Sequence, residues 1–429
     1  MARLRFVTLS VLSLVLVVVL AACSSSSPMG SLKVLVSGLP SGVSGTVLVT
    51  GPAGYSKAVT ATTTLSVPPG TYSISAAAAR GANTIVPVVY DASASSSSVN
   101  VTADATASST VTYAVRPGSG HLWVPMYTSL EAESYANGDL AASGSPSPDV
   151  TLGSSSHYGE AVAFDGAGNM WVGDYTGFLY RYDAASLGTS GTPTPSVTID
   201  ATAYSTELYA LAFDAAGDLW ISTYDNDTLV MYTPSQLSTG GALTATVVIS
   251  DDGSGSLSGP GGIAFDSAGG LWVADYSNDT LVKFSPAQLA SSGTPTPAVT
   301  LSATAGGSIA EPNDVAFDSS GDLWVSNDNT GTIVRFDASQ LASSGTPTPA
   351  TTIASSSLGG NPTGLAFDAS GNLWVSDYTS TDLRQFTNPG ALTGSVTPAA
   401  DVTVSSIGSV DYPLIAFDPP PANLPINTP

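Results

Sequence analysis

Two kinds of reactive side chain are almost absent from this sequence. It contains one cysteine and two histidines in 429 residues. A single cysteine excludes a disulfide within the chain, so the stability of the fold must come from packing. No Ser-His-Asp order, phosphate-binding glycine loop or Cys/His metal cluster occurs anywhere. These absences leave few groups from which a catalytic site could be built.

Basic residues are also scarce. Ten Lys and Arg stand against 33 Asp and Glu, which gives a net charge of −23 at pH 7. Nucleic-acid binding needs basic patches, and anionic lipids attract basic surfaces. The charge therefore argues against nucleic acid as a partner and against lipid binding through the folded surface. A soluble, monomeric folded region is expected.

Long apolar runs are confined to the first 22 residues. Arg3 and Arg5 precede the run FVTLSVLSLVLVVVL, and the segment ends with LAAC at Cys23. A charged start, an apolar middle and small residues are typical of a secretory signal peptide. LAAC resembles the lipobox of bacterial lipoproteins. That resemblance implies cleavage before Cys23, lipid on its thiol, a Ser-rich tether over residues 23–30, and anchoring to a bacterial membrane, either the outer membrane or the outer face of the cytoplasmic membrane. The alternatives are an uncleaved anchor and an ordinary signal beside an unrelated cysteine.

Residues 31–117 alternate apolar, β-branched runs with Gly, Pro and Ser turns. The spacing predicts a small antiparallel β-sandwich of about seven strands. The segment VPPGTYSISA resembles the PGTY turn of bacterial immunoglobulin-like and carboxypeptidase-regulatory-like modules. We interpret this module as a spacer between the membrane and the rest of the protein.

Residues 118–429 contain a repeat of about 50 residues, in which an AFD tripeptide is followed by a tryptophan. The phenylalanines of AFD are Phe164, Phe213, Phe265, Phe317, Phe367 and Phe417. The tryptophans are Trp123, Trp171, Trp220, Trp272, Trp324 and Trp374. Four short strands in each repeat, at a fixed period, predict a β-propeller. The D-x-x-G sequence that follows five of the six AF pairs predicts a tight hairpin between the first two strands.

The two ends of the repeat region complement each other. Trp123 has no AFD before it, and Phe417 has no tryptophan after it. We therefore expect the C-terminal strand to pair with the three N-terminal strands of the region, because closure removes two exposed sheet edges. The sequence thus predicts an all-β protein, a β-sandwich followed by a six-bladed β-propeller with 3+1 closure.

Two stretches of the repeats resemble known families. LWVADYSNDTLVKF resembles NHL-repeat proteins, and PNDVAFDSSGDLWVS resembles the SMP-30/gluconolactonase class. Both resemblances imply six blades. The second implies a divalent-metal lactonase or esterase with Glu160 and Asn313 as ligands of Ca²⁺ or Mg²⁺. The third ligand of that class would fall at Thr363, where the sequence departs from the pattern.

A histidine provides a third, weaker hypothesis. His157 precedes Glu160 in the same predicted loop, and propeller lyases use histidine with a metal or as an acid or base. The alternative is an ordinary histidine on a surface loop.

The residues after each tryptophan suggest a binding face. They place Tyr beside Asp or Asn near the turn between the second and third strands, at Asp174, Tyr175, Tyr224, Asp275, Tyr276, Asn327, Asp377 and Tyr378. One interpretation is structural, with Asp capping the turn and Tyr filling gaps between blades. The other is an acidic, aromatic surface for a protein or glycan. The favoured function is a non-catalytic, lipid-anchored binding or scaffold protein without a cofactor; the metal hydrolase is the alternative.

Overall fold

The computed structural model describes residues 28–81, 85–127, 130–153, 158–354, 358–408 and 413–420. These residues form short β-strands with a few single-turn helices, which confirms the predicted all-β class. The chain divides into two compact units. The first contains residues up to Val36, Val47–Ser75 and Ala94–Val111; the second contains Ser37–Thr46, Ala76–Ser93 and everything from Thr112 onward. Among the described residues, no helix has the length and hydropathy needed to cross a bilayer.

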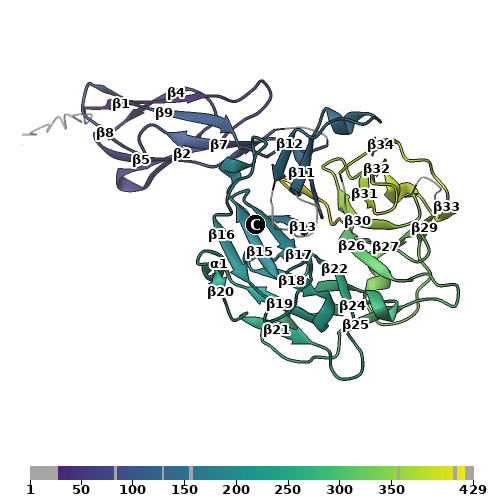
Figure 1. Cartoon of the computed structure of the whole chain (residues 1–429). Coiled ribbons are helices and arrows are strands. Elements are labelled where there is room, and N and C mark those ends of the chain that lie inside the picture. The colour runs from purple at the N-terminus through teal and green to yellow at the C-terminus, as the bar shows by residue number, and fades with distance from the viewer. Residues whose placement is uncertain are drawn as a thin grey trace, which may run out of the picture. The chain divides into compact units, whose positions relative to one another are not determined.

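The described residues between 30 and 115 form two sheets of nine strands, two more than the sequence predicts (Figure 1). The five-stranded sheet has the order β4 (Thr63–Val67), β1 (Gly30–Ser37), β9 (Thr106–Val115), β7 (Val89–Ala94) and β6 (Ala79–Arg80). The four-stranded sheet has the order β3 (Tyr55–Val59), β2 (Val47–Gly51), β5 (Gly70–Ala76) and β8 (Ser98–Val101). Alternate side chains are buried in β5 and β8, as expected for a sheet covered on one face.

Six further sheets repeat one four-stranded antiparallel plan, and we number them one to six along the chain and letter their strands A to D in order of pairing. The A strands are β35 (Ala416–Asp418), β13 (Gly159–Phe164), β17 (Leu208–Phe213), β22 (Pro260–Phe265), β26 (Pro312–Phe317) and β30 (Pro362–Phe367). The B strands are β10 (His121–Pro125), β14 (Met170–Asp174), β18 (Leu219–Thr223), β23 (Leu271–Asp275), β27 (Leu323–Asn327) and β31 (Leu373–Asp377). The C strands are β11 (Leu130–Ala136), β15 (Phe178–Tyr182), β19 (Thr228–Tyr232), β24 (Thr280–Phe284), β28 (Thr332–Phe336) and β32 (Asp382–Phe386). The D strands are β12 (Val150–Gly153), β16 (Val197–Asp200), β21 (Val247–Ser250), β25 (Val299–Ser302), β29 (Thr351–Ala354) and β34 (Val402–Ser405).

Sheet one is assembled from both ends of the repeat region. Strand β35 pairs antiparallel with β10, with Phe417 opposite Leu122 and Ala416 opposite Trp123. On one side of this segment, the Ser376 hydroxyl of sheet six donates to the Pro413 carbonyl at 2.7 Å. On the other side, the Leu414 amide donates to the Glu160 carbonyl of sheet two at 3.2 Å. The C-terminal segment therefore lies between sheets six and two and is bonded to both.

The outer strands are linked from sheet to sheet. In each case strand D pairs in parallel with the C–D connection of the following sheet, twice through the short strands β20 (Gly241–Ala242) and β33 (Gly394–Val396). The other links are Leu152 with Gly191, Ile249 with Gly293, Leu301 with Gly345 and Val404 with Gly144. The last of these joins sheet six to sheet one, so the series of links returns to its start.

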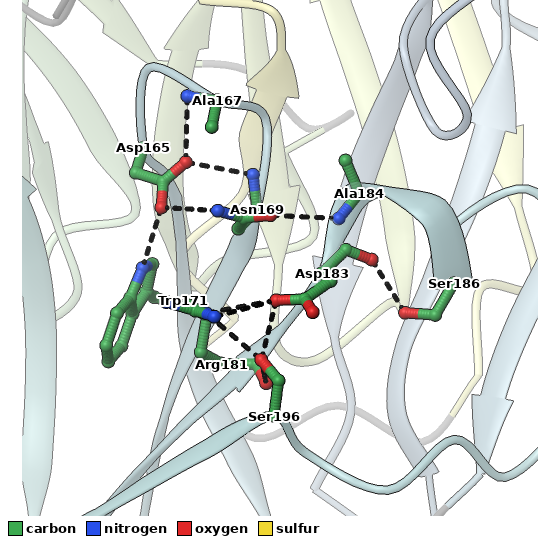
Figure 2. A network of polar contacts seen from close by, with 9 residues as sticks. All are labelled: Asp165, Ala167, Asn169, Trp171, Arg181, Asp183, Ala184, Ser186 and Ser196. Carbon is green, nitrogen blue, oxygen red and sulfur yellow. Dashed lines mark hydrogen bonds and ion pairs between the residues drawn. The ribbon is translucent and has the colours of Figure 1, made fainter. Parts of the chain in front are cut away.

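A hydrogen-bonded lock at the A–B turn explains why AFD and Trp recur together (Figure 2). In sheet two, Asp165 Oδ1 accepts the backbone amides of Ala167 and Asn169, each at 3.0 Å. Its Oδ2 accepts the indole N–H of Trp171 at 3.4 Å. Sheets three to six repeat the bond between this carboxylate and the indole at 3.0–3.3 Å. Each following glycine has a positive φ, for example 81° at Gly168, as the predicted tight turn requires.

Short helices and 3₁₀ turns lie between the strands, and both α-helices follow C strands. The α-helices α1 (Pro234–Leu237) and α2 (Pro286–Leu289) each begin with a capping box, formed in α1 by Thr233 and Gln236. The 3₁₀ turns are η1 (Pro52–Gly54), η2 (Asp139–Ala141), η3 (Ala184–Ser186), η4 (Tyr224–Asn226), η5 (Tyr276–Asn278), η6 (Ala338–Leu341) and η8 (Pro389–Ala391). None is long enough to form a packing layer of its own.

Candidate functional site

The Asp and Asn residues at the end of strand B lie beneath the predicted binding face. Asp174, Asp275, Asn327 and Asp377 are all 0% exposed. Asp174 accepts the backbone amides of Thr176 at 2.8 Å and Phe178 at 2.9 Å, so it caps its own B–C turn. These four side chains are buried, and the bonds of Asp174 are those of the structural interpretation, in which Asp caps the turn.

Two of the four also fix the segment that enters strand A. Asp275 accepts the backbone amide of Ser258 at 2.6 Å, and Asn327 accepts that of Ala310 at 3.1 Å. Burial raises the pKa of Asp275 to about 6, although its hydrogen bonds lower it. Asp377 caps Ser380 at 2.7 Å and lies 3.7 Å from Arg384. The B–C turns and the loops that enter the A strands are thus held together on one side of the sheets.

Tyrosines on this side form two ring-to-ring groups. The Tyr127 ring lies 5.6 Å from Tyr158 and 5.8 Å from Tyr175, measured between centroids. A second group follows, in which Tyr224 lies 5.8 Å from Tyr209 and 5.9 Å from Tyr276. Aromatic pairs at these distances attract each other beyond their buried area.

The tyrosines differ in how far they reach solvent. Tyr175 is 43% exposed, Tyr158 41% and Tyr378 40%. Tyr224 and Tyr276 are half-buried. The predicted tyrosines are therefore partly accessible on the side of the B–C turns, whereas the neighbouring Asp and Asn side chains are not.

Carboxylates surround these rings. The Tyr276 hydroxyl lies 3.2 Å from both Glu311 Oε2 and Asp328 Oδ2 and can donate to one of them at a time. The charge of Glu207 is the largest cause that raises the pKa of Tyr175. Burial raises the pKa of Tyr224, with Glu207 and Glu311 adding to it. The face is therefore both aromatic and strongly anionic.

Glu160 and Asn313, the predicted metal ligands, are buried in the A strands of sheets two and five. Glu160 is 4% exposed and Asn313 is 0% exposed. The side-chain oxygen of Asn313 accepts the hydroxyl of Tyr209 at 2.9 Å, which leaves this oxygen one further lone pair. Thr363, at the position of the third ligand, lies 3.0 Å from the hydroxyl of Ser376. A hydroxyl thus stands where the resemblance implies a third, carboxylate ligand, and Ca²⁺ and Mg²⁺ take six or more oxygen ligands.

The described residues include no group of three or more His, Cys, Asp or Glu placed to hold a metal ion. His157, the residue of the lyase hypothesis, and Cys23 both lie outside the described residues.

A cavity of about 150 Å³ is lined by the A strands of all six sheets. Its lining is apolar except for Asp314, which is 8% exposed. The two carboxylate oxygens of Asp314 accept the amides of Val315 and Leu365, each at 2.8 Å. The sequence reasoning missed this residue, although a signal was present, because the other five repeats have only small or aliphatic residues at this position: Ala161, Ala210, Gly262, Gly364 and Leu414.

One family model matches part of the chain. The NHL repeat matches residues 257–284, which span the end of the loop into strand A, strands A to C and the turns of sheet four. This match and the six repeated four-stranded sheets support a β-propeller fold for the repeat region. A search of curated proteins gave no match.

Several solved structures are similar at low identity. Virginiamycin B lyase from Staphylococcus aureus is 13% identical, with a TM-score of 0.38 over 54% of this chain and 67% of that one. A protein of unknown function from Bacteroides caccae is 10% identical, with a TM-score of 0.49 over 69% of this chain and 97% of that one. At these values neither similarity carries an argument about activity.

Proposed function

We propose that this protein is a non-catalytic, lipid-anchored binding protein of the bacterial cell envelope. In this proposal, the lipid on Cys23 holds the chain at the membrane and the β-sandwich acts as a spacer. A six-bladed propeller, closed by β35, then presents one face to a protein or glycan. The cyclic series of links between outer strands and the pairing of β35 with β10 support the closure.

The observation that carries the binding role is the tyrosine–carboxylate face. It combines Tyr175 and Tyr378, each at least 40% exposed, with the half-buried pair Tyr224 and Tyr276. Tyrosine offers a large contact area at low cost in conformational entropy. The buried Asp and Asn side chains below hold the loops in place, which reduces the ordering cost on binding.

Basic side chains on the opposite side of the sheets provide a matched control. Arg181 forms an ion pair with Asp183 at 2.9 Å, beside the A–B turn of sheet two (Figure 2). Substitution of Arg181 changes surface charge without touching the B–C turns. It separates a specific effect of the tyrosine face from a general effect of charge.

The test is an array of purified bacterial envelope glycans and peptides, probed with the full chain in detergent. We expect binding to a subset of the array, weakened at least tenfold by the double substitution Tyr175→Ala and Tyr276→Ala, because aromatic anchors dominate binding energy. Arg181→Ala should bind as the wild type does. Binding that survives loss of both tyrosines, or no binding to any member, would exclude this proposal.

The alternative is a divalent-metal lactonase or esterase that uses Glu160 and Asn313. It predicts bound metal and EDTA-sensitive lactone hydrolysis by the purified full chain. Metal analysis without stoichiometric Ca²⁺ or Mg²⁺, together with no EDTA-sensitive turnover, would exclude it. The threonine at position 363, where the resemblance implies a carboxylate ligand, favours the binding role over this alternative.

A further inference from the structure

One position in strand C differs between the repeats in a way that affects charge. The residue directly opposite the tryptophan of strand B is Arg181, Lys283, Arg335 or Gln385 in sheets two, four, five and six. In sheet three the residue opposite Trp220 is Met231. Sheet three therefore lacks the side-chain donor that these four sheets place beside the tryptophan.

In sheets four and five this donor is a cation held by a carboxylate and an indole ring. Lys283 Nζ lies 2.6 Å from Asp266 Oδ2 and 5.7 Å from the centroid of the Trp272 ring. The Arg335 guanidinium carbon likewise lies 5.7 Å from the Trp324 ring. In sheet six, Gln385 donates to Asp368 Oδ2 at 3.2 Å. The local structure is thus suited to a cation or an N–H donor at this point.

Sheet three keeps the carboxylates but supplies no such donor. Asp214 Oδ2 accepts the indole N–H of Trp220 at 3.3 Å. In sheet five, the equivalent of Asp218 is Asp322, and its carboxylate accepts the backbone amide of Ala338 at 2.8 Å. The corresponding residue in sheet three is Pro234, which has no N–H to offer Asp218. Burial and the nearby charge of Asp214 raise the pKa of Asp218, as expected for two neighbouring carboxylates that form no ion pair among the described residues.

A cavity of about 470 Å³ opens at these two carboxylates. Its apolar lining includes Met231 from sheet three and Phe265, Pro286 and Leu289 from sheet four. Small-ligand sites have volumes of roughly 300–1,000 Å³ and combine apolar walls with a few polar groups. The cavity therefore has room for an aliphatic chain ending in a charged group.

We propose that this cavity binds an alkylammonium group, with the ammonium at Asp214 and Asp218 and the aliphatic stem along Met231 and Leu289. Lys283 in sheet four is the template, because it places the same chemical group at the equivalent carboxylate from within the chain. The ammonium belongs either to a free amine or to a lysine side chain of a peptide. The site lies at the A–B turn of its sheet, separate from the tyrosine face, and does not depend on the proposed function.

The experiment uses the full chain labelled with ¹³C at its methionine methyl groups. Three probes are titrated: cadaverine, N-acetyl-lysine N-methylamide and the neutral N-acetyl-norleucine N-methylamide. We expect the Met231 methyl signal to shift saturably with at least one ammonium compound and to remain unchanged with the neutral compound. Binding of cadaverine alone identifies a free amine as the ligand, and binding of the lysine derivative identifies a peptide side chain.

Variants test whether the cavity binds an ammonium group because sheet three lacks a side-chain donor at position 231. Both variants at position 231 remove the methyl probe, so ligand binding to them is measured by saturation-transfer NMR on the ligand signals. Met231→Lys should fill the site from within and abolish saturation transfer to the ligand, whereas the apolar control Met231→Leu should retain it. Asp218→Asn should weaken binding at least tenfold and keeps the test valid if the lysine variant does not fold. Failure of both ammonium compounds to bind, equal binding of the neutral compound, or equal binding by the Lys and Leu variants would overturn the proposal.

Discussion

Replacement of Asp314 by asparagine is expected to change how the stability of the protein depends on pH. Asp314 is the one charged residue that lines the 150 Å³ cavity, and it is 8% exposed. Burial raises its pKa from 3.8 to about 7, against the lowering effect of hydrogen bonds from the amides of Leu365 and Val315. Asparagine has nearly the same shape but does not titrate.

The direction in which the free energy of unfolding changes with pH follows from proton binding. Between pH 3.8 and about 7, the folded state holds a proton on Asp314 that the unfolded state has released. The free energy of unfolding therefore falls by about 1.4 kcal/mol for each pH unit as the pH rises through this window. The stabilisation is complete below the window and lost above it, a total on the order of 4 kcal/mol.

Asparagine adds a cost that does not depend on pH. Its single amide oxygen can accept one of the two backbone amides, and its NH₂ group would face the other, at a cost of about 1–3 kcal/mol. Asp314→Asn should thus be less stable than the wild type near pH 4 and more stable near pH 8. Asp275 and Asp418, whose pKa values burial raises to about 6 and about 7, remain in both proteins and cancel in the difference.

The assay is urea unfolding at each pH unit from 4 to 8, followed by tryptophan fluorescence, since all six tryptophans lie in the repeat sheets. The measured quantity is the difference in free energy of unfolding between the variant and the wild type. A difference that stays constant across this range would refute the raised pKa of Asp314. A difference that changes sign would support it.

Two further substitutions test the packing around the same cavity. Gly262→Ala should destabilise the protein by about 1–3 kcal/mol or more, because a Cβ there would lie 2.6 Å from the Cα of Asp314; Gly293→Ala, where the nearest atom is 3.9 Å away, should be neutral in the same urea titration. Phe417→Ala, at a residue 4% exposed, should cost about 3–5 kcal/mol and reduce hydrogen-exchange protection first in β10 and β11. Equal loss of protection in every sheet would contradict a special role for the C-terminal strand.

The repeat pattern predicted most of the local structure of the second unit. The position of AFD and Trp placed strands A and B and the turn between them, because one carboxylate bonds both the turn amides and the indole. The same pattern predicted that Phe417 would pair with the strand of Trp123, and the structure has this pairing. A hydrogen-bonding unit that recurs with fixed spacing leaves a periodic signal in the sequence.

The candidate site was less predictable. Asp174 and Tyr175 are neighbours in the sequence, yet the first is 0% exposed and the second 43%. Alternation along a strand does not extend into a turn, so the sequence left open whether the Asp caps the turn or lies on a contact surface. Asn313 was predicted as a ligand, but its oxygen is bonded to Tyr209, which is 104 residues away in the sequence.

Within the repeat region, the sequence by itself determined the strands, their turns and the number of repeats, because these depend on contacts within about 50 residues. The tertiary structure decided what a residue does when it differs from its counterparts in the other repeats. Asp314 lines the inner cavity because six separate A strands surround it, and Met231 borders a cavity because sheet four contributes the opposite wall. Burial and charge at such positions depend on neighbours from other repeats, and no single repeat carries that information.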